Sequence, residues 1–120
     1  MAANSKRVNL DRSTLERLEG ELRERALAEG TNLFPGLDEL SSATVVEDID
    51  IDESSLTATK EKGGWLHVDG VVNVYVTLNY GDKNDSVSRT DSFPGHFTAL
   101  VNDTRVRLES TTVDTSSFYQ

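Results

Sequence analysis

Apolar and polar residues alternate over residues 65–80, and this alternation predicts a β-strand. Every even position of the run except Gly70 is apolar, whereas the odd positions are mostly polar. One face of the strand is therefore expected to lie on the hydrophobic core, and the other is expected to remain accessible to solvent.

The dipeptide Asp69-Gly70 inside this run is by itself a signal for a two-residue hairpin turn. A turn there would continue the core face through odd positions and leave Val72 and Val74 on the solvent side. The pattern therefore predicts one continuous strand of sixteen residues, roughly 50 Å long at about 3.3 Å per residue. A strand of this length is expected to bend, and Gly70 is the expected position of the bend.

Residues 10–29 are predicted to form the one long helix of the chain. Ser13 and Glu16 have the spacing of a capping box, in which Ser13 caps the first turn. Gly20 inside the helix costs about 1 kcal/mol relative to alanine, so we expect a close packing contact or a bend there. The apolar stripe that would face a sheet comprises Leu15, Leu18, Leu22 and Ala26.

Two further strands are expected between this helix and the long strand. In residues 44–52 the core positions are Val45, Ile49 and Ile51, and three aspartates occupy the opposite face. Residues 55–60 either continue this strand or form a short strand of their own.

The clearest hairpin signal is Asn102-Asp103, which follows a strand predicted over residues 87–101. With these two residues as the loop, Val101 would pair with Thr104, and the apolar residues of both strands would share one face. The apolar positions of the last strand then change parity, so a β-bulge is expected near residues 110–112.

Together these elements predict a single α+β domain over residues 10–120, preceded by a flexible N-terminal arm at residues 1–9. The helix packs on one face of a strongly bent antiparallel meander sheet of four to five strands. In outline this arrangement resembles the cystatin-like and nuclear-transport-factor-like cone folds. The resemblance covers the order of elements alone, so it implies a fold and no function.

The composition restricts the chemistry that the chain can perform. The sequence has no cysteine, which excludes disulfides, thiolate nucleophiles and cysteine-based metal sites. The formal net charge of -9 argues against nucleic acid as a partner, because phosphate binding relies on clustered Lys and Arg. Salt adaptation, mimicry of DNA charge and simple solubility all fit this acidity. Since the sequence shows no signal peptide and no apolar span, we expect a cytoplasmic protein that does not bind membranes.

The alternating carboxylates Asp48, Asp50 and Asp52 resemble the start of a calcium-binding loop. Glu53 stands where such a loop needs glycine, and the intervening residues are apolar. We therefore interpret the three aspartates as a solvated acidic strand face that discourages edge pairing.

His67 and Asp69 share the polar face of the long strand, and His96 lies on the polar face of its expected neighbour. Two histidines and a carboxylate could bind a metal or support acid–base catalysis. No motif for nucleophilic, phosphate-binding or zinc chemistry accompanies them. We therefore predict no catalytic residue, no metal site, no cofactor and no enzymatic activity.

The accessible face of the sheet carries aromatic and arginine residues, which are enriched at binding hot spots. Our first hypothesis is a non-catalytic protein-binding or accessory domain that acts through this face or an exposed edge strand. Its partner would be another protein or a second copy in a homodimer. The alternatives are a small-ligand-binding cone-type domain and an acidic inhibitor or DNA mimic from a phage or defence system. The predicted partner-binding residues are Trp65, Tyr75, Arg105 and Arg107.

Overall fold

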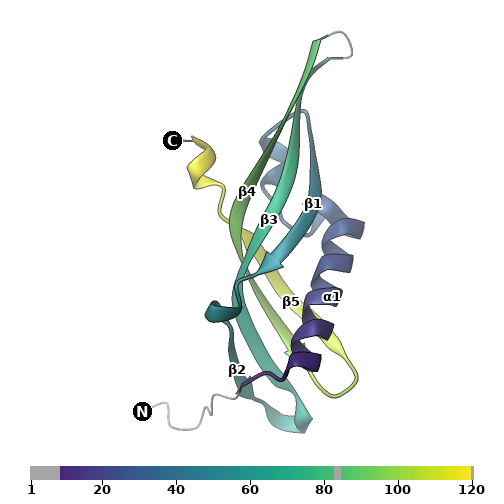
Figure 1. Cartoon of the computed structure of the whole chain (residues 1–120), viewed down its shortest axis with the longest axis vertical. Helices are drawn as coiled ribbons and strands as arrows, with labels where there is room; N and C mark the ends of the chain where they lie inside the picture. The colour runs from purple at the N-terminus through teal and green to yellow at the C-terminus, as the bar shows by residue number, and fades with distance from the viewer. Residues whose placement is uncertain (1–8, 83–84, 120) are drawn as a thin grey trace.

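A computed structural model of the chain describes residues 9–82 and 85–119. It has one N-terminal helix packed on a five-stranded antiparallel sheet that does not close, which confirms the predicted α+β fold (Figure 1). Of the predicted flexible arm, residues 1–8 lie outside the described residues. The elements are α1 (Arg12–Glu29), β1 (Ala43–Ile51), β2 (Thr57–Lys60), β3 (Leu66–Asp82), β4 (Asp85–Val101) and β5 (Val106–Val113), with short 3-10 turns between them and after β5.

The sheet has the strand order β1-β3-β4-β5, and β2 pairs with β3 beyond the end of β1. Because β3 runs without interruption through Asp69 and Gly70, the prediction of one long strand rather than a hairpin is confirmed. The domain accommodates this strand by being elongated, with principal extents of 58 × 31 × 19 Å. Its radius of gyration is 16.5 Å, against about 14 Å for a compact chain of this length. Gly70 lies where β1 gives way to β2, and a Cβ atom there would come within 2.8 Å of Leu56 Cδ2.

The hydrophobic core lies between α1 and the sheet face formed by the even positions of β3. The predicted stripe of α1 is buried, as are Val72, Val74 and Val76 of β3. One core assignment was wrong: Val45 is 46% exposed, and Val46 is buried in its place. The reason is a β-bulge between Val46 and Asp48, which shifts the facing pattern of β1 by one residue.

Two details of α1 also differ from the sequence prediction. The N-cap is Asp11 and not Ser13, because the Asp11 carboxylate accepts a hydrogen bond of 2.7 Å from the Thr14 backbone N–H. No packing contact explains Gly20, since a Cβ atom there would meet nothing within 4 Å.

In the hairpin between β4 and β5 the side chains lie on the predicted faces of the sheet, but the register differs from the prediction. Val101 pairs with Val106 instead of Thr104, so the turn is two residues longer. The Asn102 side chain accounts for the longer turn, because its Oδ1 accepts hydrogen bonds from the backbone N–H groups of Thr104 and Arg105. A shift by two residues preserves the face of every side chain. The expected bulge lies next to its predicted position, at the register shift opposite Thr98 and Ala99.

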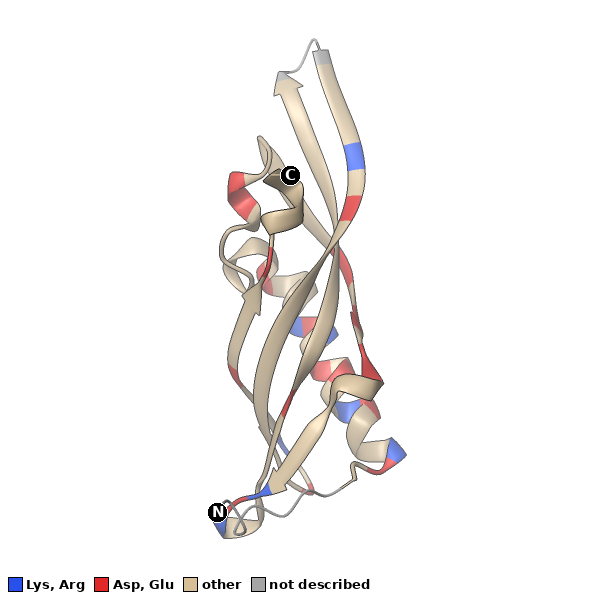
Figure 2. Ribbon diagram, turned by 90° about the vertical axis from the view of Figure 1, so that its left-hand side faces the viewer, with Lys and Arg blue, Asp and Glu red and all other residues tan. Residues whose placement is uncertain are grey.

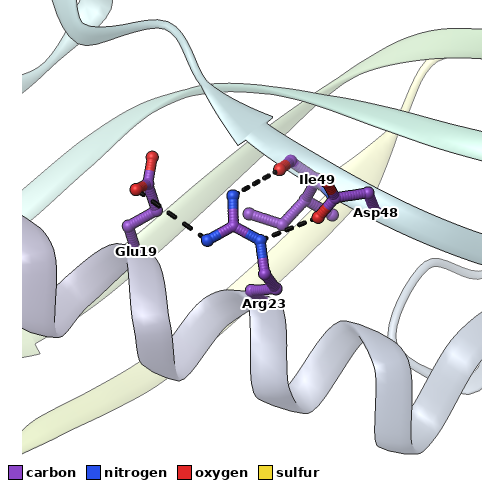
Figure 3. Close-up of polar contacts among 4 residues, drawn as sticks. All are labelled: Glu19, Arg23, Asp48 and Ile49. Carbon is purple, nitrogen blue, oxygen red and sulfur yellow. Dashed lines mark hydrogen bonds and ion pairs between the residues drawn. The ribbon is translucent and has the colours of Figure 1, made fainter.

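Arg23 of α1 ties the helix to the edge strand β1 (Figure 3). Its Nε donates a 2.7 Å hydrogen bond to Asp48 Oδ1, and its Nη2 donates a 3.1 Å bond to the Ile49 carbonyl. Glu19 lies 3.9 Å from the same guanidinium group. The hydrogen bond from Arg23 lowers the pKa of Asp48 and raises the pKa of Arg23. One side chain therefore fixes the helix and also occupies a backbone carbonyl of an outer strand.

Candidate functional site

The sheet face opposite α1, which we call the uncovered face, is formed by the odd positions of β3 and the even positions of β4. The register places Tyr75 opposite Ser92 and Val71 opposite His96. Most side chains on this face of β3 are half-buried by their neighbours, whereas Tyr75 is 41% exposed. The uncovered face is therefore the surface on which the predicted partner-binding residues must be judged.

The structure does not gather those residues into one patch. Trp65 and Tyr75 are ten positions apart on extended backbone, which separates them by roughly 33 Å at about 3.3 Å per residue. Arg107 lies near the Trp65 end, because it pairs with the residue of β4 that faces His67. Arg105 belongs to the turn that precedes β5. Tyr75 is thus separate from the other predicted partner-binding residues.

Tyr75 lines a shallow hollow of its own on the middle of the sheet. The hollow is bordered by Glu47 of β1 and by Thr90 and Ser92 of β4. An exposed aromatic ring with hydroxyl groups and a carboxylate around it offers both apolar contact and hydrogen bonds to a partner.

A second group of residues on the uncovered face comes together only in the folded chain. His96 Nε2 lies 3.9 Å from Asp69 Oδ1, and the Thr57 hydroxyl donates a 2.9 Å hydrogen bond to the same carboxylate oxygen. At 3.9 Å the carboxylate lies beyond hydrogen-bond distance of the imidazole, but its charge can stabilise the imidazolium that a general-base histidine becomes. His96 also borders a small hollow of about 230 Å³ that reaches Asp114.

His67, the third member of the group considered from the sequence, belongs to neither contact. Within residues 9–82 and 85–119, no group of three or more His, Cys, Asp or Glu side chains has the arrangement of a metal site. The Asp69–His96 pair could be identified only from the β3–β4 register, which a face pattern with a period of two leaves open. Thr57 gave no signal in the sequence, because its role depends on the pairing of β2 with β3.

The three aspartates of residues 48–52 have separate roles. Asp48 binds Arg23, Asp50 is exposed, and Asp52 accepts hydrogen bonds from the backbone and hydroxyl of Ser54 at the end of β1. Figure 2 shows acidic residues spread over α1, β1 and the connecting segments rather than concentrated on one surface.

The residues described above thus belong to an α+β fold whose sheet is open and has one uncovered face. The chain belongs to the family described as "Predicted pPIWI-associating nuclease", whose model matches residues 7–119. Searches of the curated proteins and of the solved structures gave no match. None of the helices in the described part of the chain combines the length and apolar character needed to span a membrane.

Membership of this family corrects the prediction that the protein is not an enzyme, because the family is described as a predicted nuclease. The prediction relied on the lack of any recognisable catalytic motif in the sequence. Acid–base groups that meet across neighbouring strands leave no such motif, since their sequence spacing depends on the strand register.

Proposed function

We propose that this domain is the part of a cytoplasmic pPIWI-associating nuclease through which the nuclease binds the pPIWI protein, and that the binding surface is the middle of the uncovered face. The observation that carries the proposal is the 41% exposed Tyr75 in its hollow. Large aromatic residues on an accessible sheet face are typical anchors of protein interfaces. The family description supplies the partner, since it names association with pPIWI.

The test measures binding of the purified chain to a pPIWI protein from the same organism. Tyr75→Ala is expected to weaken binding by about tenfold or more, which corresponds to the loss of about 1.4 kcal/mol. Leu27→Ala is the matched control, because Leu27 is a 53% exposed large side chain on α1. Equal affinities for Tyr75→Ala and the unaltered chain, with both proteins folded, would place the interface elsewhere.

A second candidate function is cleavage of a phosphodiester bond, and the specific observation in its favour is the Asp69–His96 contact of 3.9 Å. In this proposal His96 removes a proton from the attacking hydroxyl or water, and Asp69 stabilises the imidazolium that forms. The hollow beside His96 would receive the scissile phosphate. The acidity of the whole chain opposes nucleic-acid binding, so this activity would depend on a partner that contributes positive charge.

The chain contains only two histidines, which supply a variant and its control on the same strand pair. His96→Gln should reduce cleavage of labelled DNA or RNA by about 100-fold or more, the usual contribution of a general base. His67→Gln should leave cleavage unchanged, because His67 does not contact Asp69. Assays should contain the pPIWI protein and divalent cations. Equal rates for His96→Gln and the unaltered protein would rule out the proposed base.

A further inference from the structure

One edge of the sheet is open for most of its length. β4 pairs with β3 along both strands, but β5 pairs with β4 only from Gly95 onwards. Within the described residues, no other strand pairs with the outer side of residues 86–92. Residues 88–92 lie opposite the part of β3 that pairs with β1, whereas residues 86 and 87 extend beyond β1 into the tip of β3 and β4 that projects at the top of Figure 1. We call residues 86–92 the open edge.

The backbone of the open edge presents hydrogen-bonding groups to solvent. The Pro94 carbonyl accepts a 2.8 Å bond from the Asp114 N–H on the outer side of β4. Because backbone direction alternates along an antiparallel strand, the even residues of β4 point their N–H and C=O groups outward. Ser88, Thr90 and Ser92 are therefore available to another strand. In the absence of such a strand, the Ser92 N–H donates a 2.8 Å hydrogen bond to the Asp91 carboxylate.

The edge formed by β1, in contrast, is protected against pairing. Arg23 occupies the Ile49 carbonyl, a β-bulge interrupts the strand, and the exposed carboxylates of Glu47 and Asp50 repel an acidic partner. The outer side of β5 is approached by the segment after α1, where the Thr111 hydroxyl donates to the Leu33 carbonyl. At the open edge the C-terminal turn contacts the side chain of Arg89, whose guanidinium carbon lies 6.0 Å from the centroid of the Phe118 ring, and pairing with another strand would require this side chain to move. Among the described residues, that turn makes no backbone hydrogen bond to residues 88–92.

The sequence around the open edge is self-complementary. From Val87 to Phe93 it has the order apolar, serine, cation, threonine, anion, serine, apolar, and the central residue is Thr90. We propose that the open edge pairs antiparallel with the open edge of a second copy of this chain, with the two-fold axis at Thr90. Arg89 of each copy then faces Asp91 of the other, and each Val87 faces a Phe93.

The proposed pairing satisfies both the backbone and the side chains. Ser88, Thr90 and Ser92 of one copy face Ser92, Thr90 and Ser88 of the other, and these are the residues whose backbone groups point outward. Each facing pair can exchange two backbone hydrogen bonds, which gives about six between the copies. Arg89 and Asp91 lie 3.2 Å apart within one chain, with side chains 58% and 30% exposed, and they can exchange this contact for two contacts between copies. Val87, which is 59% exposed, would be partly covered by the second strand, beside the buried Phe93 and the Phe118 ring that packs on it.

Charge also selects this register over its neighbours. A two-fold axis at residue 89 or 91 would place two arginines or two aspartates opposite each other, and like charges in facing positions are destabilising. An axis at residue 88 would place Arg89 opposite Val87, and an axis at residue 92 would place Asp91 opposite Phe93, so a charge would face an apolar side chain in both cases. The contact is smaller than the about 1,000 Å² of a typical stable interface, so we expect a micromolar dissociation constant.

The test is sedimentation of the chain over a wide concentration range, without a pPIWI protein. The unaltered chain should sediment as a monomer–dimer equilibrium. Arg89→Asp and Asp91→Arg should each weaken self-association by about tenfold or more, because each variant brings like charges together. Lys62→Asp is the control, since Lys62 is an exposed cation in the turn before β3, at the opposite end of the sheet.

Mixing the two single variants decides between the proposed register and a loss of folding. One variant has two aspartates at positions 89 and 91, and the other has two arginines, so the mixture should form a heterodimer. A chain with both substitutions should recover self-association. The proposal is overturned if the unaltered chain stays monomeric at all concentrations, if the single variants dimerise normally, or if their mixture does not associate. Because no pPIWI protein is present, these outcomes are independent of the proposed function.

Discussion

Replacement of Gly95 by alanine tests the close approach of β4 and β5 on which the end of the sheet depends. A Cβ atom at Gly95 would lie 2.5 Å from the backbone oxygen of Thr112 and 3.3 Å from Val72 Cγ1. The backbone of β5 cannot rotate away like a side chain, so the two strands must separate by at least about 0.5 Å.

The expected cost follows from two opposing terms. Overpacking of this kind lowers the free energy of unfolding by about 1–3 kcal/mol. The reduced conformational freedom of the unfolded chain raises it by about 0.4–1 kcal/mol. We expect a net loss of about 1–2 kcal/mol in the free energy of unfolding, which lowers Tm by about 4–8 °C for a domain of this size. Thermal and urea denaturation followed by circular dichroism measure both quantities.

Gly20→Ala is the matched control, because the same atom placed at Gly20 meets nothing within 4 Å. Gly20 lies inside α1, so alanine should raise the unfolding free energy by about 0.5–1 kcal/mol. The two substitutions are therefore expected to have opposite signs. A Gly95→Ala protein as stable as the unaltered chain would show that β4 and β5 do not approach as closely as described.

Three further outcomes test the core, the ion pair at β1 and the C-terminal turn. Val74→Asp should destabilise the domain by more than about 4 kcal/mol, because it buries an unpaired carboxylate, whereas Asn73→Asp on the uncovered face should change denaturant stability by less than about 1 kcal/mol; equal losses would refute the face assignment. Asp48→Asn should cost about 0.5 kcal/mol at pH 7, since the side chain is half exposed. The bond from Arg23 lowers the folded-state pKa of Asp48, so this difference is present above the unfolded pKa of about 3.9 and should decrease as pH falls through the folded pKa; a difference that increases in denaturation curves as the pH is lowered below about 3.9 would exclude the ion pair as its cause. Phe118→Ala should lower Tm by several degrees, because its ring packs edge-on against the buried ring of Phe93 at a centroid distance of 6.3 Å.

The sequence predicted those parts of the fold that depend on side-chain facing. The periods of two and of 3.6 assigned the core faces of α1 and β3, because burying a polar residue costs more than any local preference gains. The same reasoning failed at Val45, since a bulge changes the period without leaving a clear signal at Glu47. The predicted N-cap of α1 was two residues too late, because Asp11 rather than Ser13 caps the helix. The predicted turn after β4 was two residues too short, because Asn102 accepts hydrogen bonds from Thr104 and Arg105. At both places several neighbouring side chains compete to accept the same backbone hydrogen bonds.

The candidate site was much less accessible to sequence reasoning. The sequence identified Tyr75 as a residue on the solvent side, but it could not show that Trp65 and the arginines lie far from it. It also could not show that Asp69 meets His96, because strands can slide by two residues without changing which face is buried. The acid–base pair therefore depended on a register that only the assembled sheet provides.

The sequence by itself determined that the chain forms one helix and a long alternating strand with a single buried face. This information is local, since it depends on neighbours two to four positions apart. The tertiary structure decided which strands pair, where pairing stops and which polar groups become neighbours. The most consequential of these decisions is the early end of β5, because it leaves the outward backbone groups of Ser88, Thr90 and Ser92 open to a second strand.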